Sequence, residues 1–541
     1  MLYRNNVCND HVLPTPVYAE RLETMLSGYD PVLKEMLISG FRHGFHIGYK
    51  GEVNSISTVK NLQSTVKLKS EVTSALNKEV RQGRMAGPFA DPPFKSFQLN
   101  PIGIVPKKDP KKFRMIIDLS FPPGNSINDG IDDSYAQVHY PSVNDAIKAL
   151  LSCGPKAYMA KTDIEKAFRL IPLAPSQYHM LCVKWDGVYY FDKTLPMGCR
   201  SSCKIFQSFS DAIKFIAAKH GIDFLINYLD DFLIVAPSYQ LCLEALREFR
   251  AICAFLGVPL AADKTFLPVQ VMIFLGLEFD SVVEVVRLPQ EKLVRCREGI
   301  AWLLSKKCLC TLREMQSILG LLSFACSVIV PGRAFLRRLF ALTVGIKKPH
   351  FFVKLTSSAK EDLRVWQHFL NDYNGVSLYK EEMFLSEKVC HFFTDASKTL
   401  GCGACFGTHW FSLPWPSQWW KDQTITFLEL VPIVLALEAW GESIRNHCLI
   451  LHTDNFSLMH VINSQSSKEE LVMYLIRRLV LKALHANVLI KAEHIPGINN
   501  VWADALSRLQ VSRFLVLHPS ADKVASSVTP LPLSLDCKLK L

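Results

Sequence analysis

Two adjacent aspartates, Asp230 and Asp231, constrain this chain most, because they stand between two strand-like apolar runs at 224–229 and 232–235. A third aspartate, Asp163, ends another strand-like segment. Carboxylates among apolar strands are costly to ionise, since burial and mutual repulsion both oppose the charge. A divalent cation removes that cost, and hard oxygen ligands favour Mg²⁺ or Mn²⁺. The pattern therefore predicts a metal site, although an Asp-Asp pair taken alone is more often a surface turn.

The segments around these aspartates resemble, in the same order, the sequence blocks of reverse transcriptases. Tyr228-Leu-Asp-Asp231 resembles the family signature, and Asp163-Ile-Glu-Lys-Ala-Phe168 resembles the first metal-binding block. The resemblance implies that Asp163 and Asp230 ligate metal, that Asp231 contributes charge and that Tyr228 contacts the substrate. It also places Phe168 where the family has an aromatic residue that excludes a ribose 2′-hydroxyl. A core phenylalanine on an amphipathic helix would fit the same position.

A basic tip joins two predicted strands at 102–106 and 113–119. Lys107 and Arg114 in this hairpin resemble the two cations with which the family grips the incoming triphosphate. The chemistry needs them, because triphosphate charge must be balanced and a guanidinium offers a planar fork. Without the resemblance, an exposed basic turn is more often a solvated face than a site.

Further segments extend the resemblance downstream. Leu195-Pro-Met-Gly-Cys-Arg-Ser-Ser202 resembles the nucleotide-binding turn, which places Met197 and Gly198 near the substrate. Many relatives have glutamine at the position of Met197. Lys264 lies in a block that supplies a lysine near the pyrophosphate, which makes it a candidate general acid. The remaining matches are a primer-grip hairpin at 274–279 and a helical thumb at 311–320.

Four acidic residues in the second half of the chain form another pattern. Asp395 and Asp454 end strand-like segments, Glu429 opens an amphipathic helix, and Asp504 lies on a later helix. Each one alone is explained by ordinary cap and helix-end chemistry. Together, their order resembles the ribonuclease H fold and its metal-binding carboxylates, which implies hydrolysis of RNA in hybrids by two-metal activation of water. His494 matches the loop histidine of retroelement versions and is a candidate accessory residue, although a structural histidine explains it equally well.

The resemblance implies an α+β multidomain fold: a right-hand reverse transcriptase of fingers, palm and thumb, followed by a ribonuclease H-like α/β domain. The expected domains are an N-terminal extension at 1–57, fingers and palm at 58–285, a helical thumb at 286–345, a connection at 346–387, a ribonuclease H-like domain at 388–510 and a flexible C-terminal tail at 511–541.

The implied function is an RNA-directed DNA polymerase that also degrades RNA in RNA–DNA hybrids, copying retrotransposon RNA into DNA with two Mg²⁺ or Mn²⁺ ions at each site. The expected partners are RNA and DNA template-primers, RNA–DNA hybrids and dNTPs, with an element-encoded Gag-like protein and a recombinase as further candidates. Segments such as 40–48 and 118–124 look like DIRS-type, tyrosine-recombinase retrotransposons. An LTR or pararetroviral polymerase is the alternative origin, and a domesticated or decayed copy that binds nucleic acid without catalysis is the alternative function.

Length and composition set wider limits. A chain of 541 residues is too long for one hydrophobic core, and its net charge of +11 permits a polyanionic partner without requiring one. Sixteen cysteines without a spaced framework indicate reduced thiols, so an intracellular protein of the cytoplasm or nucleus is expected. The uncharged stretch between Glu314 and Arg333 is long enough to span a membrane, but its polar residues and Pro331 favour a buried helix. No membrane association is expected.

Overall fold

The computed structural model describes residues 12–51, 58–107, 109, 113–306, 309–372, 376–377, 389–486 and 488–529. The chain divides into two compact units, Met1–Leu275 with Asp280–Val283 and Gly276–Phe279 with Glu284–Leu541, and the residues of β11 (Leu277–Asp280) are divided between them. The three aspartates of the predicted polymerase site all belong to the first unit. The four acids of the predicted ribonuclease H site all belong to the second.

The first unit combines long helices with short strands. Its helices are α1 (Ala19–Met25), α2 (Pro31–His43), α3 (Ser64–Lys67), α4 (Lys69–Arg81), α5 (Val143–Cys153), α6 (Ser202–Lys219) and α7 (Tyr239–Leu256), with 3₁₀ turns η1 (Asn128–Gly130), η2 (Asp133–Tyr135), η3 (Ala167–Leu170), η4 (Pro175–Met180) and η5 (Ala262–Lys264). Its strands are β1 (Met85–Phe89), β2 (Ile102–Pro106), β3 (Phe113–Ile117), β4 (Tyr158–Asp163), β5 (Cys182–Trp185), β6 (Val188–Asp192), β7 (Leu225–Tyr228), β8 (Asp231–Ala236), β9 (Phe266–Val269) and β10 (Val271–Phe274).

A four-stranded antiparallel sheet of order β7-β8-β4-β9 forms the centre of the first unit. The middle of β8 is apolar and fully buried, as a strand packed on both faces requires, and α5, α6 and α7 pack against this sheet. Ser238 caps α7 by accepting the N–H of Leu241, and Gly257 ends the helix with a left-handed φ of +78°. Local signals in the sequence therefore set the limits of the helix that supports the predicted metal-binding strands.

Two smaller sheets complete the first unit. One has the order β1-β6-β5, and the other is the hairpin of β2 and β3, in which Val105 pairs with Arg114. The predicted strands on either side of the basic tip are thus confirmed. Most of the tip itself, at 108 and 110–112, lies outside the described residues.

Residues 12–51 pack into the core of the first unit. Leu22 of α1 and Phe41 of α2 are buried in one hydrophobic cluster with residues of α6 and α7. The apolar side of α2 recurs every three to four residues, which is the pattern of a helix with one buried face. The described residues of the N-terminal extension predicted at 1–57 are therefore part of the core of the first unit, which the sequence did not indicate because it signals the helices but not where they pack.

The second unit begins with helices and ends with a mixed sheet. Its helices are α8 (Gln290–Ser305), α9 (Leu312–Ala325), α10 (Arg337–Ala341), α11 (Ser357–Asp372), α13 (Gln418–Lys421), α14 (Ile425–Trp440), α15 (Phe456–Ser464), α16 (Glu470–His485), α17 (Val501–Ser507) and α18 (Val511–Leu517), with 3₁₀ turns η6 (Val330–Phe335) and η7 (Gly497–Asn499). Its strands are β12 (Val285–Arg287), β13 (Leu309–Thr311), β14 (Phe352–Lys354), β15 (Val376–Ser377), β16 (Val389–Ala396), β17 (Gly401–Phe406), β18 (His409–Pro414), β19 (Cys448–Thr453) and β20 (Leu489–His494).

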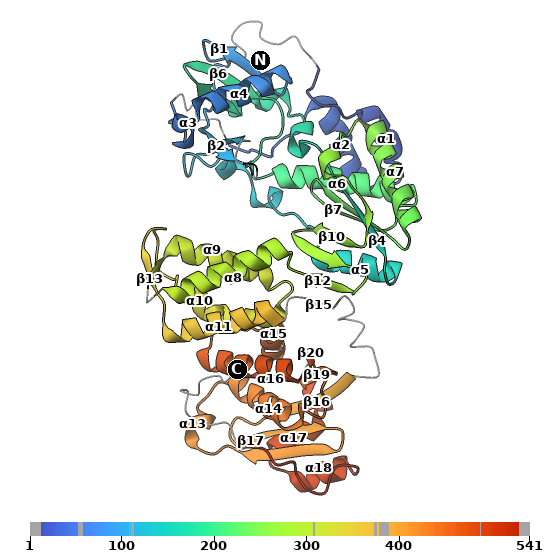
Figure 1. The fold of residues 1–541 in the computed structure, drawn as a ribbon, viewed down its shortest axis with the longest axis vertical. Coiled ribbons are helices and arrows are strands. Elements are labelled where there is room, and N and C mark those ends of the chain that lie inside the picture. Colours follow the sequence, from blue (N-terminus) through green and yellow to red (C-terminus); the bar gives the residue numbers. More distant parts are fainter. Residues whose placement is uncertain are drawn as a thin grey trace. The chain divides into compact units, whose positions relative to one another are not determined.

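A five-stranded sheet of order β18-β17-β16-β19-β20 dominates the C-terminal part (Figure 1). β16, β17 and β18 are antiparallel neighbours, whereas β19 lies parallel to both β16 and β20. Neighbouring side chains of a strand point to opposite faces. Phe392 contacts Trp440 at the end of α14, and Phe393 contacts Trp502 of α17, so these two helices cover opposite faces of the sheet.

A buried ionic cluster joins the helical and sheet parts of the second unit. The Arg477 side chain on α16 is 1% exposed, and its Nε donates to the carbonyl of Ala334 in η6 at 3.1 Å. It also lies 3.8 Å from an oxygen of Asp362 on α11, and Arg338 of α10 reaches the same oxygen at 3.4 Å. Charges this deeply buried are tolerated only when they are paired, so α10, α11, η6 and α16 depend on one another.

The predicted flexible tail at 511–541 is wrong for its first part. Residues Val511–Leu517 form α18, and Phe514 is fully buried among residues that include Trp410 and Leu506. The N–H of Ser526 donates to the carbonyl of Trp410 at 2.8 Å. The Ser-, Pro- and Lys-rich composition of the tail did not indicate that Phe514 attaches its first part to the sheet.

No described helix is both long enough and apolar enough to cross a bilayer. The uncharged stretch that raised this question is divided in the structure between α9 and the 3₁₀ turn η6.

Candidate active sites

The three predicted polymerase carboxylates lie at one end of the central sheet of the first unit. Asp163 ends β4 and Asp231 opens β8, and the strand register pairs these two residues directly. Asp230 lies in the turn between β7 and β8, where its carbonyl accepts the N–H of Ile164 at 2.9 Å. Pairing of β4 with β8 therefore brings together acids that are far apart in the sequence.

Lysines hold two of these carboxylates. Burial raises the pKa of Asp163 to about 6, although Lys264 donates to both of its oxygens at 2.8 Å, and the charge of Asp230 adds to the increase. Burial also raises the pKa of Asp230. Lys161 lies 3.1 Å from an oxygen of Asp231. Three neighbouring carboxylates, two of them with a raised pKa, fit a hard divalent cation such as Mg²⁺ or Mn²⁺, and Asp163, Asp230 and Asp231 would hold it.

Residues that the sequence analysis missed support the carboxylate turn from α6. Leu229, between Tyr228 and Asp230, has a left-handed φ of +52°. Its N–H donates to the amide oxygen of Gln207 at 3.0 Å, and its carbonyl accepts the hydroxyl of Ser210 at 2.7 Å. The ring of Tyr228 lies 4.7 Å from that of Tyr140. No spacing rule connects α6 to a turn some twenty residues later, so the sequence offered no signal.

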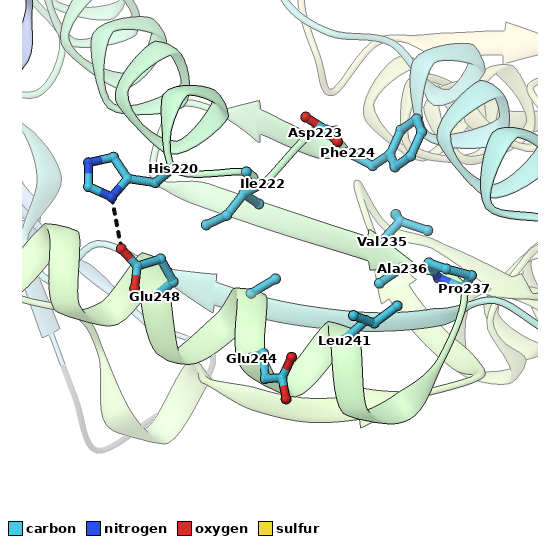
Figure 2. Close-up of a pocket in the computed structure, with 12 residues that line it drawn as sticks. His220, Ile222, Asp223, Phe224, Val235, Ala236, Pro237, Leu241, Glu244 and Glu248 are labelled. Atoms are coloured by element: carbon cyan, nitrogen blue, oxygen red, sulfur yellow. Dashed lines mark hydrogen bonds and ion pairs between the residues drawn. The ribbon is translucent and has the colours of Figure 1, made fainter.

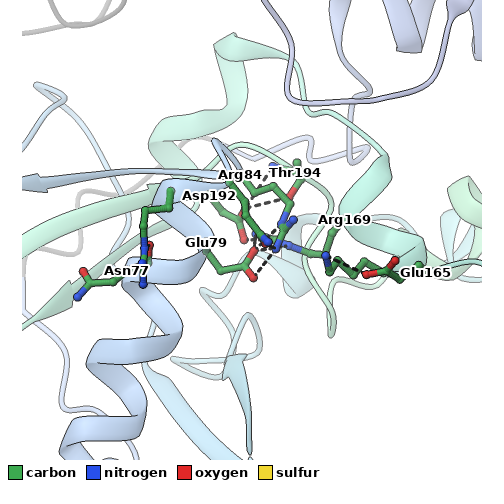
Figure 3. A network of polar contacts seen from close by, with 10 residues as sticks. Asn77, Glu79, Arg84, Glu165, Arg169, Asp192 and Thr194 are labelled. Atoms are coloured by element: carbon green, nitrogen blue, oxygen red, sulfur yellow. Dashed lines mark hydrogen bonds and ion pairs between the residues drawn. The ribbon is translucent and has the colours of Figure 1, made fainter. Parts of the chain in front are cut away.

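Phe168, the predicted sugar-selecting residue, is half-buried, and its ring meets that of Phe206 on α6 edge-on at 5.4 Å. The next residue, Arg169, anchors the η3 turn to other elements (Figure 3). Arg169 donates to Asp192 at 2.6 Å and to Glu79 at 2.9 Å. The position of Phe168 therefore depends on a half-buried arginine that the sequence analysis did not single out.

Four further predicted nucleotide contacts lie at the basic hairpin and at the turn before α6. Lys107 and Arg114 are exposed, and their role in binding triphosphate stays a prediction. Met197 is half-buried, and Gly198 is exposed with a φ of +93°, a backbone angle that suits glycine. Asn128 shapes this turn, because its amide donates to the carbonyl of Gly198 at 2.9 Å.

A pocket of about 570 Å³ opens elsewhere in the first unit (Figure 2). It is lined by residues that include Phe224, Leu241 and an ion pair of His220 with Glu248 at 2.9 Å. Ala236 in its wall is the last residue of β8, so the pocket lies at the end of the strand away from Asp231. Its position gives it no part in the chemistry of the carboxylates.

Three of the four acids in the second unit form a compact cluster. Asp395 on β16, Glu429 on α14 and Asp454 after β19 each offer an oxygen within 4.8 Å of the others. Burial and the charges of Asp454 and Asp504 raise the pKa of Asp395 to about 6, against a lowering hydrogen bond from Ser507. These donors fit a divalent cation.

Burial strongly disfavours the charged form of Glu429. It is 4% exposed, and burial together with Asp395 and Asp454 raises its pKa well above the usual range. One of its oxygens has no hydrogen-bond partner among the described residues. A divalent cation would balance a buried carboxylate in that state.

Asp504 and His494 are not part of the cluster. Arg508 holds one oxygen of Asp504 at 2.6 Å, and Arg513 lies 3.5 Å from the other. His494 is exposed, and its ring lies 5.9 Å from that of Phe456. The structure therefore brings three of the four predicted carboxylates together, while the described conformation directs the fourth to arginines.

Residues 105–279 match the family described as "Reverse transcriptase (RNA-dependent DNA polymerase)". A reverse transcriptase domain is thus confirmed for the segment that contains Asp163, Asp230 and Asp231. The chain is 24% identical over 306 residues to the Gag-Pol polyprotein of Avian reticuloendotheliosis virus, covering 54% of this chain and 24% of that protein. It is 24% identical over 378 residues to a putative enzymatic polyprotein of Cassava vein mosaic virus, covering 66% and 53%. The match thus spans less than two thirds of either relative.

A solved structure shares the fold. It is a foamy viral protease-reverse transcriptase in complex with double-stranded DNA, with a TM-score of 0.52 and 16% identity, covering 91% of this chain and 84% of that one. The TM-score indicates a common architecture, and because the identity is low the chemistry must be argued from the residues.

Proposed function

We propose that this chain is an RNA-directed DNA polymerase. The observation that carries the proposal is the meeting of Asp163, Asp230 and Asp231 at one end of the β7-β8-β4-β9 sheet, within the segment that matches reverse transcriptases. Two divalent ions held there would activate a primer 3′-hydroxyl and stabilise the leaving pyrophosphate. Lys264, hydrogen-bonded to Asp163, would give a proton to that leaving group.

We propose a second activity, hydrolysis of RNA in RNA–DNA hybrids, at the cluster of Asp395, Glu429 and Asp454. Its support is the convergence of three carboxylates, one of which is the buried Glu429 with an oxygen that has no partner among the described residues. Divalent ions at this cluster would supply an activated water for phosphodiester cleavage. Asp504 would join as a fourth ligand once its oxygens leave Arg508 and Arg513.

Template-primer duplexes, RNA–DNA hybrids and dNTPs are the proposed partners. The net charge of +11 suits a polyanion, and the foamy viral structure of similar fold is a complex with double-stranded DNA. A DIRS-type origin stays a prediction from the sequence. A decayed copy that binds nucleic acid without catalysis remains the competing function, and it predicts duplex binding without turnover.

One assay separates these functions. The full chain is given a 5′-labelled DNA primer on a 3′-labelled RNA template with dNTPs and Mg²⁺, and both strands are resolved on one gel. Primer extension together with template shortening supports both activities. Extension without shortening rejects the second proposal, and duplex binding with neither reaction rejects both in favour of the non-catalytic protein.

A further inference from the structure

Side chains of helix α6 hydrogen-bond both the backbone N–H and the backbone carbonyl of Leu229, in the turn that carries Asp230. Gln207 and Ser210 lie three residues apart on α6 and therefore share a face of the helix. The amide oxygen of Gln207 accepts the N–H of Leu229 at 3.0 Å, and the hydroxyl of Ser210 donates to the Leu229 carbonyl at 2.7 Å. Both side chains are almost fully buried, at 3% and 0% exposure. Water therefore does not compete for these bonds.

Further hydrogen bonds determine which atoms of Gln207 and Ser210 face Leu229. Asp211 accepts the side-chain amide N–H groups of Gln207 and of Asn227, each at 2.8 Å, so the oxygen of Gln207 must face Leu229. Asn227 also donates to the hydroxyl oxygen of Ser210 at 3.0 Å. That hydroxyl is left with its own proton for the Leu229 carbonyl.

Leu229 needs such support, because a left-handed φ of +52° is unfavourable for a branched side chain. Residues in such conformations cost about 1 kcal/mol or more and persist only where their surroundings hold them. The next residue is Asp230, which the proposed function makes a metal ligand. A change in the backbone of Leu229 would therefore turn the carboxylate of Asp230 directly.

We propose that Gln207 and Ser210 are positioning residues of the polymerase site, which fix the direction in which Asp230 presents its carboxylate to the metal. The assignment rests on the proposed polymerase function. Gln207 and Ser210 touch neither nucleotide nor metal in this scheme, and they act through the backbone of Leu229. Mg²⁺ demands near-ideal octahedral geometry, so a small rotation of Asp230 weakens its binding more than it weakens duplex binding.

The test compares Ser210→Ala and Gln207→Met with Ser208→Ala, a serine on the same helix whose hydroxyl bonds the Lys204 carbonyl at 3.0 Å. Single-nucleotide extension is measured over a Mg²⁺ series and a Mn²⁺ series, with template-primer affinity and melting temperature alongside. Each positioning variant should lower kcat in Mg²⁺ about tenfold and raise the Mg²⁺ concentration for half-maximal rate, which is the size expected for one buried hydrogen bond. Mn²⁺ should restore most of the rate.

Duplex affinity and the KM for dNTP should stay unchanged, and Ser208→Ala should match wild type throughout. The double variant Gln207→Met/Ser210→Ala should lose less than the product of the single effects, because both side chains hold one residue. Wild-type rates in both variants, or equal losses in Mg²⁺ and Mn²⁺ with a lower melting temperature, would overturn the assignment. A wild-type protein that extends no primer would reject the polymerase function itself and this assignment with it.

Discussion

The two carboxylate sites differ in how they deal with their own negative charge. In the first unit, Lys264 and Lys161 lie within hydrogen-bond distance of Asp163 and Asp231. In the second unit, the cluster around Glu429 has no comparable lysine among the described residues, and one oxygen of Glu429 is left without a partner. Two lysines therefore partly balance the three acids of the first site before any metal binds, whereas the second site would depend on a metal for its balance.

The two sites should therefore differ in how much free energy they gain when a divalent ion binds. A site with internal cations gains less when the ion arrives, because the ion must displace lysines from the same oxygens. A site of converging acids gains more, since the ion removes repulsion that the fold alone cannot relieve. Divalent ions should consequently stabilise the second unit more than the first.

The largest effect should come from removing one carboxylate from either site. Asp230→Asn should lower primer extension about a thousandfold or more and spare hybrid cleavage, while Asp454→Asn should do the reverse, because each removes a metal ligand from one site. Gel assays of both reactions on purified variants, with circular dichroism as the folding control, measure this. If each folded variant lost both activities, the two sites would not be independent.

Arg114 offers the next largest effect, confined to the first unit. A charge-assisted contact to a triphosphate contributes about 1.5–3 kcal/mol, so Arg114→Ala should reduce kcat/KM for dNTP about ten- to hundredfold. Lys107→Ala should act in the same direction but less, because an ammonium lacks the planar fork. Hybrid cleavage should not change in either variant.

The measurement is extension kinetics over a dNTP series, with template-primer binding at two salt concentrations. Variants that lose duplex affinity in a salt-dependent way, while their dNTP dependence stays wild-type, would identify Lys107 and Arg114 as nucleic-acid contacts. The triphosphate assignment would then be wrong.

Sugar selection should respond to Phe168. Replacement by Val opens space for a 2′-hydroxyl, so incorporation of ribonucleotides relative to deoxynucleotides should rise about tenfold. Competitive incorporation of rNTP and dNTP by one preparation measures the ratio. An unchanged ratio in an active Phe168→Val variant would show that the ring only packs against Phe206.

Removing one charge from each site should change the free energy of unfolding in opposite directions. Glu429→Gln removes a buried, unbalanced charge while keeping the shape, and should raise the free energy of unfolding by about 1–3 kcal/mol without metal. Lys264→Met removes the partner of the buried Asp163 and should lower it. Thermal melts in EDTA and in Mg²⁺ test this. A Glu429→Gln protein that melts below wild type in EDTA would contradict the charge imbalance.

The smallest effect should be an acid-dependent loss of stability in the first unit. Burial raises the pKa of Glu79, but hydrogen bonds and charge from Arg84 and Arg169 outweigh this and lower it below its usual value (Figure 3). The stabilisation is present above about pH 4.5 and is lost as the pH falls through the lowered pKa. Glu79→Gln should flatten the pH dependence of unfolding by about 1 kcal/mol, with Glu71→Gln, on the same helix, as control. If wild type and Glu79→Gln showed the same pH dependence of unfolding, the ion pairs of Glu79 would not contribute to stability.

Features of the sites that depend on local sequence were predictable. Asp163, Asp230 and Asp395 each follow or end an apolar run, and in the structure each lies at or next to the end of a strand. The hairpin at β2 and β3 was readable from alternation and turn residues. Short-range patterns of this kind carry their own physical cause, since strand pairing and helix capping involve near neighbours.

Contacts between distant segments were not predictable. Nothing in the spacing of Gln207 or Ser210 points to a turn formed much later in the chain. The pairing of Asp504 with Arg508 is different, because residues four apart on a helix face each other, so this competitor could have been anticipated. Phe514, read as part of a loose tail, shows that one aromatic side chain outweighs the composition around it.

The buried cluster around Arg477 sets a limit on dividing the chain. The predicted boundary at 388 would separate Arg477 from Asp362 and from the Ala334 carbonyl, leaving a guanidinium on a face that is apolar and sealed in the whole protein. A C-terminal fragment starting there would expose a cation with no counter-charge beside residues that favour association. Expression of the C-terminal sheet by itself therefore calls for a start near Val330, before η6, or for a neutral polar residue in place of Arg477.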